Sequence, residues 1–135
     1  MNNLGRIAAN RGDYKHAENL YKESLVLVRE VGDNERLASL LANLGSWALN
    51  RAEYEQAESY YQEGLTIARR IKDPDRISAL LMGLGAVAHS RSDYAKAEEL
   101  YQEGLGIARE IGQIERMSVL LSNLGGIASV RGHYD

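Results

Sequence analysis

Repeated glutamates are the residues of this chain whose spacing comes closest to acid–base chemistry. They stand in three matching pairs, Glu18 with Glu23, Glu58 with Glu63, and Glu98 with Glu103. A catalytic carboxylate pair needs two environments that hold its two pKa values apart, and a pair copied along the chain has the same environment each time. We therefore expect solvated or ion-paired surfaces, with Arg29, Arg69 and Arg109 as candidate partners, and no enzyme.

Histidines and glycines carry the two other kinds of chemistry to consider, metal binding and phosphate binding. His16, His89 and His133 have no second ligand at the i+3 or i+4 spacing of a helical metal site. Gly83-Leu84-Gly85 and Gly125-Gly126 fall within helical periodicity and lack the Gly-Lys-Ser/Thr that completes a phosphate loop. We expect these glycines to let helices approach closely, and we expect no metal and no cofactor.

The composition limits the class of protein and of partner. The chain has 135 residues, 44% hydrophobic and 26% charged, which is typical of one folded domain. A net charge of −3 without a basic patch argues against binding to nucleic acid or to a membrane surface. The sequence has no cysteine, no signal peptide and no run of about 18 apolar residues, so we expect a cytoplasmic protein.

A repeat of about 40 residues runs through the whole chain. Its clearest columns are Leu4-Gly5, Leu44-Gly45, Leu84-Gly85 and Leu124-Gly125, then Tyr14, Tyr54, Tyr94 and Tyr134, then Tyr21, Tyr61 and Tyr101. Apolar residues recur every three or four positions within each unit, which indicates helices. Turn residues separate these helices near Gly12, Glu53, Asp93 and His133, and at Gly32-Asp33-Asn34, Lys72-Asp73-Pro74 and Gly112-Gln113-Ile114.

Repeats of this length predict stacked helix pairs, because one pair cannot bury its apolar faces alone. We predict an all-α fold, a right-handed α-solenoid of antiparallel helix pairs, as a single domain over 1–135. Its units are a partial one at about 1–33, then 34–73, 74–113 and a partial one at 114–135. The predicted helices cover about 1–11, 14–31, 35–51, 54–71, 75–91, 94–111 and 115–131. We name those of odd rank inner helices and the others outer helices.

The repeat unit resembles the tetratricopeptide repeat, whose pattern runs Trp-x2-Leu-Gly-x2-Tyr, then Ala-x3-Phe, then Pro. Here the pattern reads Leu41-x2-Leu44-Gly45-x2-Ala48, followed by Ala57-x3-Tyr61. Leu and Ala replace the first aromatic residues, and no proline ends the outer helix. The longer unit is similar to the arrays of bacterial signalling ATPases and regulators and of kinesin light chains. The resemblance implies a scaffold that binds a protein or peptide, as the repeat segment of a larger signalling or adaptor protein.

The resemblance also implies that the ligand lies in a concave groove lined by the inner helices. That groove would be faced by Asn43, Ser46, Leu49 and Asn50, by Met82, Ala86, His89 and Ser90, and by Ser122, Asn123, Gly126 and Ser129. Asn43 and Asn123 match a family asparagine that grips the peptide backbone, and Gly83 interrupts this ladder. The stretches 37–50, 77–90 and 117–130 hold no Lys, Arg, Asp or Glu, which independently indicates buried helices or a surface for a neutral ligand.

A second hypothesis is structural self-assembly through the ends of the array. In the repeat register Met1 enters partway along an inner helix and Asp135 stands where an outer helix should begin, so we expect a segment of a longer array. The last inner helix would then offer Leu120, Leu121, Leu124 and Ile127 to a second copy, in a head-to-tail stack or a closed dimer. Exchange of Leu121 for Glu should weaken such assembly, whereas loss of the Asn43 and Asn123 amides should weaken a groove ligand.

Overall fold

The computed structural model describes residues 14–134, so the helix predicted over 1–11 and the turn near Gly12 lie outside the described residues. Every regular element in the described part is an α-helix: α2 (Tyr14–Val31), α3 (Asn34–Asn50), α4 (Tyr54–Arg70), α5 (Pro74–Ser90), α6 (Tyr94–Ile111) and α7 (Ile114–Tyr134). The predicted all-α solenoid is confirmed. The bounds of α2 and α6 agree with the prediction, and those of α3, α4 and α5 differ from it by no more than one residue.

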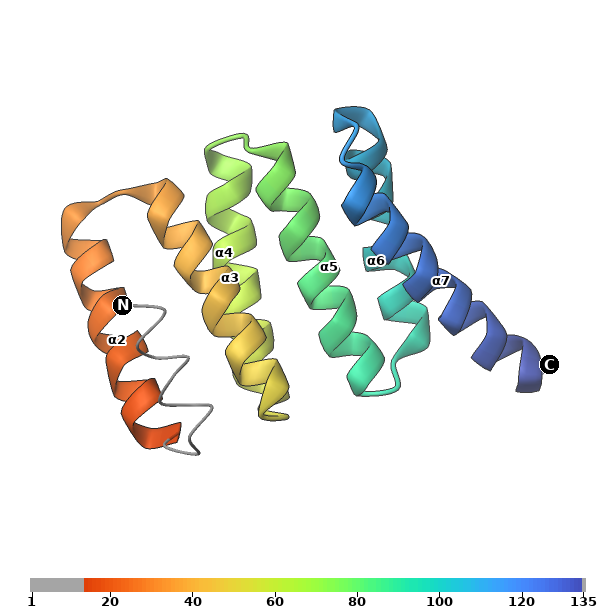
Figure 1. Cartoon of the computed structure of the whole chain (residues 1–135), viewed down its shortest axis with the longest axis horizontal. Coiled ribbons are helices and arrows are strands. Elements are labelled where there is room, and N and C mark those ends of the chain that lie inside the picture. Colours follow the sequence, from red (N-terminus) through yellow and green to blue (C-terminus); the bar gives the residue numbers. More distant parts are fainter. Residues whose placement is uncertain (1–13, 135) are drawn as a thin grey trace.

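Consecutive helices pack against one another, as the short turns require. Figure 1 shows α3, α5 and α7 following one another across the front of the molecule, with α4 and α6 behind them. The inner helices α3 and α5 are also in direct contact with each other. The inner helices therefore share one surface, and the outer helices α4 and α6 lie on its far side.

A residue in the left-handed backbone region follows each of the helices α2 to α6. These residues recur at every twentieth position, and they are Gly32, Ala52, Lys72, Ser92 and Gly112, with φ between +57° and +76°. Each reverses the chain after a helix and so allows the next helix to return antiparallel. Only the first and last of them are glycines, the residue type that adopts this conformation without steric cost.

Acidic residues begin several of the helices. Asp33 and Asp93 each accept a hydrogen bond at 3.2 Å from a main-chain amide one turn into α3 and α6, and Asp73 does so at 3.3 Å in α5, where Pro74 takes the first turn. The prediction of an acidic cap is therefore confirmed for Asp93 and wrong for Glu53, whose side chain makes no such bond. The longer Glu53 side chain instead brings its carboxylate to 3.3 Å from Arg51.

The last helix, α7, does not end where the sequence predicts. A turn was expected near His133, but the helix continues to Tyr134. In the two earlier turns at this repeat position, Ala52 and Ser92 have positive φ, and an acidic residue follows each of them. In α7 a histidine takes the place of that acid and Gly132 remains helical, so the backbone conformation that reverses the chain elsewhere does not form here.

The tyrosines of the outer helices form the centre of the core by packing against glycines of the inner helices. The ring of Tyr61, which is 4% exposed, lies between Gly45 on α3 and Gly83 on α5, and a Cβ atom added at either glycine would stand 2.6 Å from that ring. Tyr101 packs on Gly85 in the same way, at 2.5 Å. These three glycines therefore make room for tyrosine rings. The sequence predicted instead that Gly83 and Gly85 would let two helix backbones approach closely. Gly125 and Gly126 pack against neither a ring nor a backbone, since added Cβ atoms would meet nothing within 4 Å.

Two of the repeated glutamates form the predicted ion pairs between neighbouring outer helices. Arg29 contacts Glu63 at 2.7 Å, and Arg69 contacts Glu103 at 3.0 Å. Arg109, the third predicted partner, has no such pair among the described residues. These pairs lie in solvent, where each contributes less than about 1 kcal/mol. Each pair joins two neighbouring outer helices at the surface.

Candidate functional site

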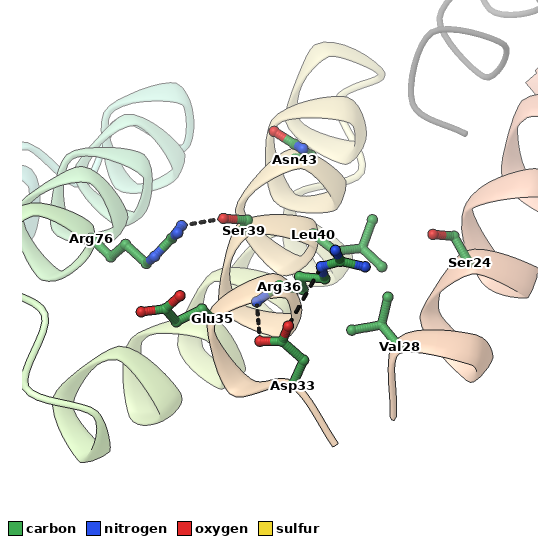
Figure 2. A pocket seen from close by; sticks show the side chains of 9 residues that line it. All are labelled: Ser24, Val28, Asp33, Glu35, Arg36, Ser39, Leu40, Asn43 and Arg76. Atoms are coloured by element: carbon green, nitrogen blue, oxygen red, sulfur yellow. Dashed lines mark hydrogen bonds and ion pairs between the residues drawn. The ribbon is translucent and has the colours of Figure 1, made fainter. Parts of the chain in front are cut away.

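Two adjoining clefts open on the surface of the inner helices. The first, between α2 and α3, has a volume of about 560 Å³, and the second, between α3 and α5, about 310 Å³. The first is lined by Ser24, Val28, Asp33, Glu35, Arg36, Ser39, Leu40, Asn43 and Arg76, and the second by Ala38, Ser39, Ala42, Asn43, Asp75, Arg76, Ala79, Leu80 and Arg116. Ser39, Asn43 and Arg76 line both clefts, so the two form one continuous surface. Figure 2 shows the residues that line the first cleft.

Helix α3 presents these side chains because of its start and its period. Asp33 caps the helix, so Arg36, Ser39 and Asn43 follow at steps of three and four residues along one face. On another face Leu41 and Leu44 are buried in the core, which fixes the rotation of α3 about its axis. The polar face of α3 is thereby held toward the clefts.

Arginine and aspartate side chains cross-link the inner helices at this surface. Arg116 of α7 donates to the Asp75 carboxylate at 2.5 Å and to the Asp75 carbonyl oxygen at 3.0 Å. Its hydrogen bond holds the pKa of Asp75 below the usual value. Arg76 donates to the Ser39 hydroxyl of α3, and its Nε lies 3.0 Å from Asp73. Each arginine thus ties its own inner helix to the preceding one.

The charges around the two clefts balance. Three arginines line them, Arg36, Arg76 and Arg116, together with three acids, Asp33, Glu35 and Asp75. A surface of this kind has no excess charge with which to attract a strongly acidic or basic ligand. It offers polar groups at fixed positions instead.

Sequence reasoning missed these arginines. They form a column with the 40-residue spacing of the repeat, at the first turn of each inner helix. The charge-free stretches begin one residue later, at 37, 77 and 117. The arginine column therefore lies just outside the stretches from which the groove was predicted. The repeat register itself was the signal that could have found it.

Asn43 occupies the place where the clefts meet. Its side chain is exposed, and in the described part of the chain its amide makes no hydrogen bond. Figure 2 shows it on α3 beyond Ser39, on the same side of the helix as the cleft. It is the one residue of the predicted groove set that lines both clefts.

The other predicted groove residues are spread along the inner helices at varied depth. Ser46, Asn50, Ser90, Ser122, Gly126 and Ser129 are exposed, whereas Leu49, Met82, Ala86, His89 and Asn123 are half-buried. Two of them already have contacts within the chain. The Ser46 hydroxyl shares a hydrogen bond of 2.8 Å with that of Tyr61, and the His89 ring lies 5.6 Å from the ring of Tyr94.

The residues predicted for self-association divide into buried and exposed ones. Leu120 and Ile127 are 0% exposed, because α6 covers that side of α7 with Tyr101 and Leu105. Both are part of the core, so their assignment to a docking surface was wrong. Leu124 is half-buried, and Leu121 is 47% exposed and remains available for contact.

In residues 14–132, no three His, Cys, Asp or Glu side chains are grouped as metal ligands. None of the helices in that range is both long enough and apolar enough to cross a membrane.

Comparison with known families gives a match over most of the chain. A family model described as "Tetratricopeptide repeat" matches residues 1–70 and again residues 38–110. No curated protein matches the chain.

Solved structures share its fold at low sequence identity. BtubC (BKLC) from P. vanneervenii aligns with a TM-score of 0.86 and 20% identity, over 95% of this chain and 53% of that one, so this chain spans about half its length. The tetratricopeptide domain of Arabidopsis FLU aligns with 0.69 and 19%, over 73% and 83%. The N-terminal domain of stress-induced protein-1 (STI-1) from C. elegans aligns with 0.66 and 15%, over 88% and 90%.

Proposed function

The chain belongs to the tetratricopeptide repeat family, whose domains mediate protein–protein interaction, and on that premise we propose that its inner-helix surface binds an extended peptide segment of a partner protein. One observation carries the proposal. The two clefts meet at Asn43, an exposed amide that has no hydrogen bond within the described residues.

The chemistry of Asn43 suits a peptide main chain. Its side-chain amide offers both a donor and an acceptor, and a main-chain amide and carbonyl provide the complementary pair. An extended peptide leaves these groups free, whereas a helical one uses them internally. Ser39 and Arg76, which are hydrogen-bonded to each other, line both clefts beside Asn43 as further polar groups.

The rest of the surface favours a ligand with little net charge. Ala42 and Ala79 line the α3–α5 cleft and leave room for ligand side chains. Over the two clefts together, three arginines are balanced by three acids, so a run of like charges on the ligand would meet as much repulsion as attraction. We propose a neutral, polar segment that crosses from the α2–α3 cleft to the α3–α5 cleft.

A library of random peptides, selected on the full chain, tests this proposal. Selected peptides should be uncharged overall and should perturb the amide resonances of Ser39, Asn43 and Ala79. Asn43→Ala should weaken their binding about tenfold, the effect of losing one or two hydrogen bonds. Asn19→Ala, at an exposed asparagine of the outer helix α2, is the matched control and should bind as the parent does.

Two results would count against the groove. Peptides that bind Asn43→Ala and the parent equally well would place the ligand elsewhere. Failure to select any peptide above background would leave the clefts without the affinity that the proposal requires.

A further inference from the structure

Small side chains line the deeper part of the cleft between α3 and α5. Ala42 of α3 and Ala79 of α5 are half-buried there, and Ala38 and Leu80 are each 1% exposed. The exposed side chain of Asn43 follows Ala42 directly on α3. The cleft therefore combines an apolar interior with a polar group at its edge.

The next pair of inner helices, α5 and α7, carries larger side chains at the equivalent positions. Forty residues after Ala42 stands Met82, and forty residues after Ala79 stands Val119. Met82 is half-buried and packs against the hydrophobic cluster that contains Leu120. Its Cγ, Sδ and Cε atoms have no counterpart at Ala42, so the α3–α5 cleft lacks a side chain that the chain itself supplies one repeat later.

The surroundings of Ala42 and Met82 are equivalent in kind. Ala42 packs against the cluster that contains Leu80, which is 1% exposed, and Met82 against that of Leu120, which is 0% exposed. Methionine is flexible and suits irregular apolar spaces of this sort. Met82 thus shows which chemistry this place in the repeat accepts, and at Ala42 the described residues leave the place open.

We propose that the α3–α5 cleft holds one flexible apolar side chain of the bound peptide, methionine or leucine, in the space that Met82 fills in the next repeat. The proposal rests on the proposed function, in which Asn43 holds the peptide main chain. It adds that an otherwise polar segment carries an apolar residue at one fixed position, where burial against Leu80 and the two alanines favours it.

The peptides selected on the full chain test the pocket. They should share methionine or leucine at one position. A synthetic copy with alanine at that position should bind the parent chain about tenfold more weakly, since a large apolar side chain is no longer buried.

A variant that copies the next repeat provides the matching change in the protein. Ala42→Met should weaken binding of the parent-selected peptide by a similar factor, because the new side chain occupies the cleft. On this variant the alanine copy of the peptide should bind as well as the original, because the two changes remove the same contact. Ala95→Met, the same substitution at an exposed alanine of the outer helix α6, is the control and should bind as the parent does.

The parent chain alone gives a further readout if Ala42→Met does not fold. The methyl resonances of Ala42 and Ala79 should shift with the original peptide and remain in place with its alanine copy. Peptides that require Asn43 but share no apolar position, methyl resonances that ignore the peptide, or equal losses from the alanine copy on the parent and on Ala42→Met would overturn the pocket alone. Peptides that bind Asn43→Ala as well as the parent would instead overturn the proposed function.

Discussion

At the scale of single residues, one glycine connects the core to the surface of the inner helices. The family resemblance puts an asparagine at the position of Gly83, as at Asn43 and Asn123, and the sequence shows this ladder interrupted. The structure supplies the reason. A Cβ atom at Gly83 would stand 2.6 Å from the ring of Tyr61, a side chain that is 4% exposed. The asparagine is absent here because the tyrosine occupies its space.

Two glycine substitutions should therefore act in opposite directions. Gly83→Ala should lower the free energy of unfolding by about 1–3 kcal/mol, the usual cost of overpacking a core. Gly126→Ala should raise it by up to about 1 kcal/mol, because alanine favours the helix and its Cβ would meet nothing within 4 Å. Urea denaturation measures both values. Similar effects at the two positions would contradict the role assigned to Tyr61.

The same tyrosine has a second sign of a tight environment. Burial raises the pKa of Tyr61, and the hydrogen bond with Ser46 acts in the opposite direction. Burial also raises the pKa of Tyr101, for which no such bond opposes the effect. Both rings are thus held as neutral phenols, consistent with their place against the glycines of the inner helices.

At the scale of elements, the left-handed residues that end the helices are a source of strain. Ala52, Lys72 and Ser92 have φ near +60°, a conformation that costs an L-residue about 1–2 kcal/mol. Ala52→Gly should remove this cost and, after the entropy that glycine gains in the unfolded chain, stabilise the protein by about 0.5–1 kcal/mol. Gly112→Ala places alanine in the same conformation and should destabilise by a similar amount. Thermal unfolding of the two variants, with shifts of opposite sign, checks the argument.

Helices α2 to α6 were predictable from the sequence because the same pattern recurs in each unit. Turn residues mark the ends of α2 and α6, and the apolar spacing identifies the helices between them. The end of α7 was not predictable in this way, since its turn position has neither the acid nor the positive φ of the others. Periodicity locates a helix, whereas a turn depends on individual residues.

The candidate site was less predictable than the helices. Leu120 and Leu121 are adjacent and equally apolar, yet α6 buries the first and leaves the second exposed. Likewise, Asn43 lines both clefts while Ser46, one turn further along, bonds to Tyr61. Whether a residue is apolar or polar does not determine which neighbouring helix covers its side chain. That coverage depends on how each helix is rotated against the next.

At the scale of the whole molecule, a solenoid is held together by contacts between neighbouring helices only. The largest hydrophobic cluster is formed by α3, α4 and α5, with buried residues that include Ala48, Tyr61 and Leu84. Among residues 14–132, the outermost helices α2 and α7 have fewer such contacts. Leu27 on α2 and Leu121 on α7 each remain about half exposed. Resistance to local opening should therefore be greatest in the middle of the chain.

Amide hydrogen exchange provides the test of this gradient. At low protein concentration, the amides of α5 should exchange most slowly and those of α2 and α7 markedly faster, because helices with few buried contacts open without global unfolding. Uniform protection at low concentration would contradict the gradient.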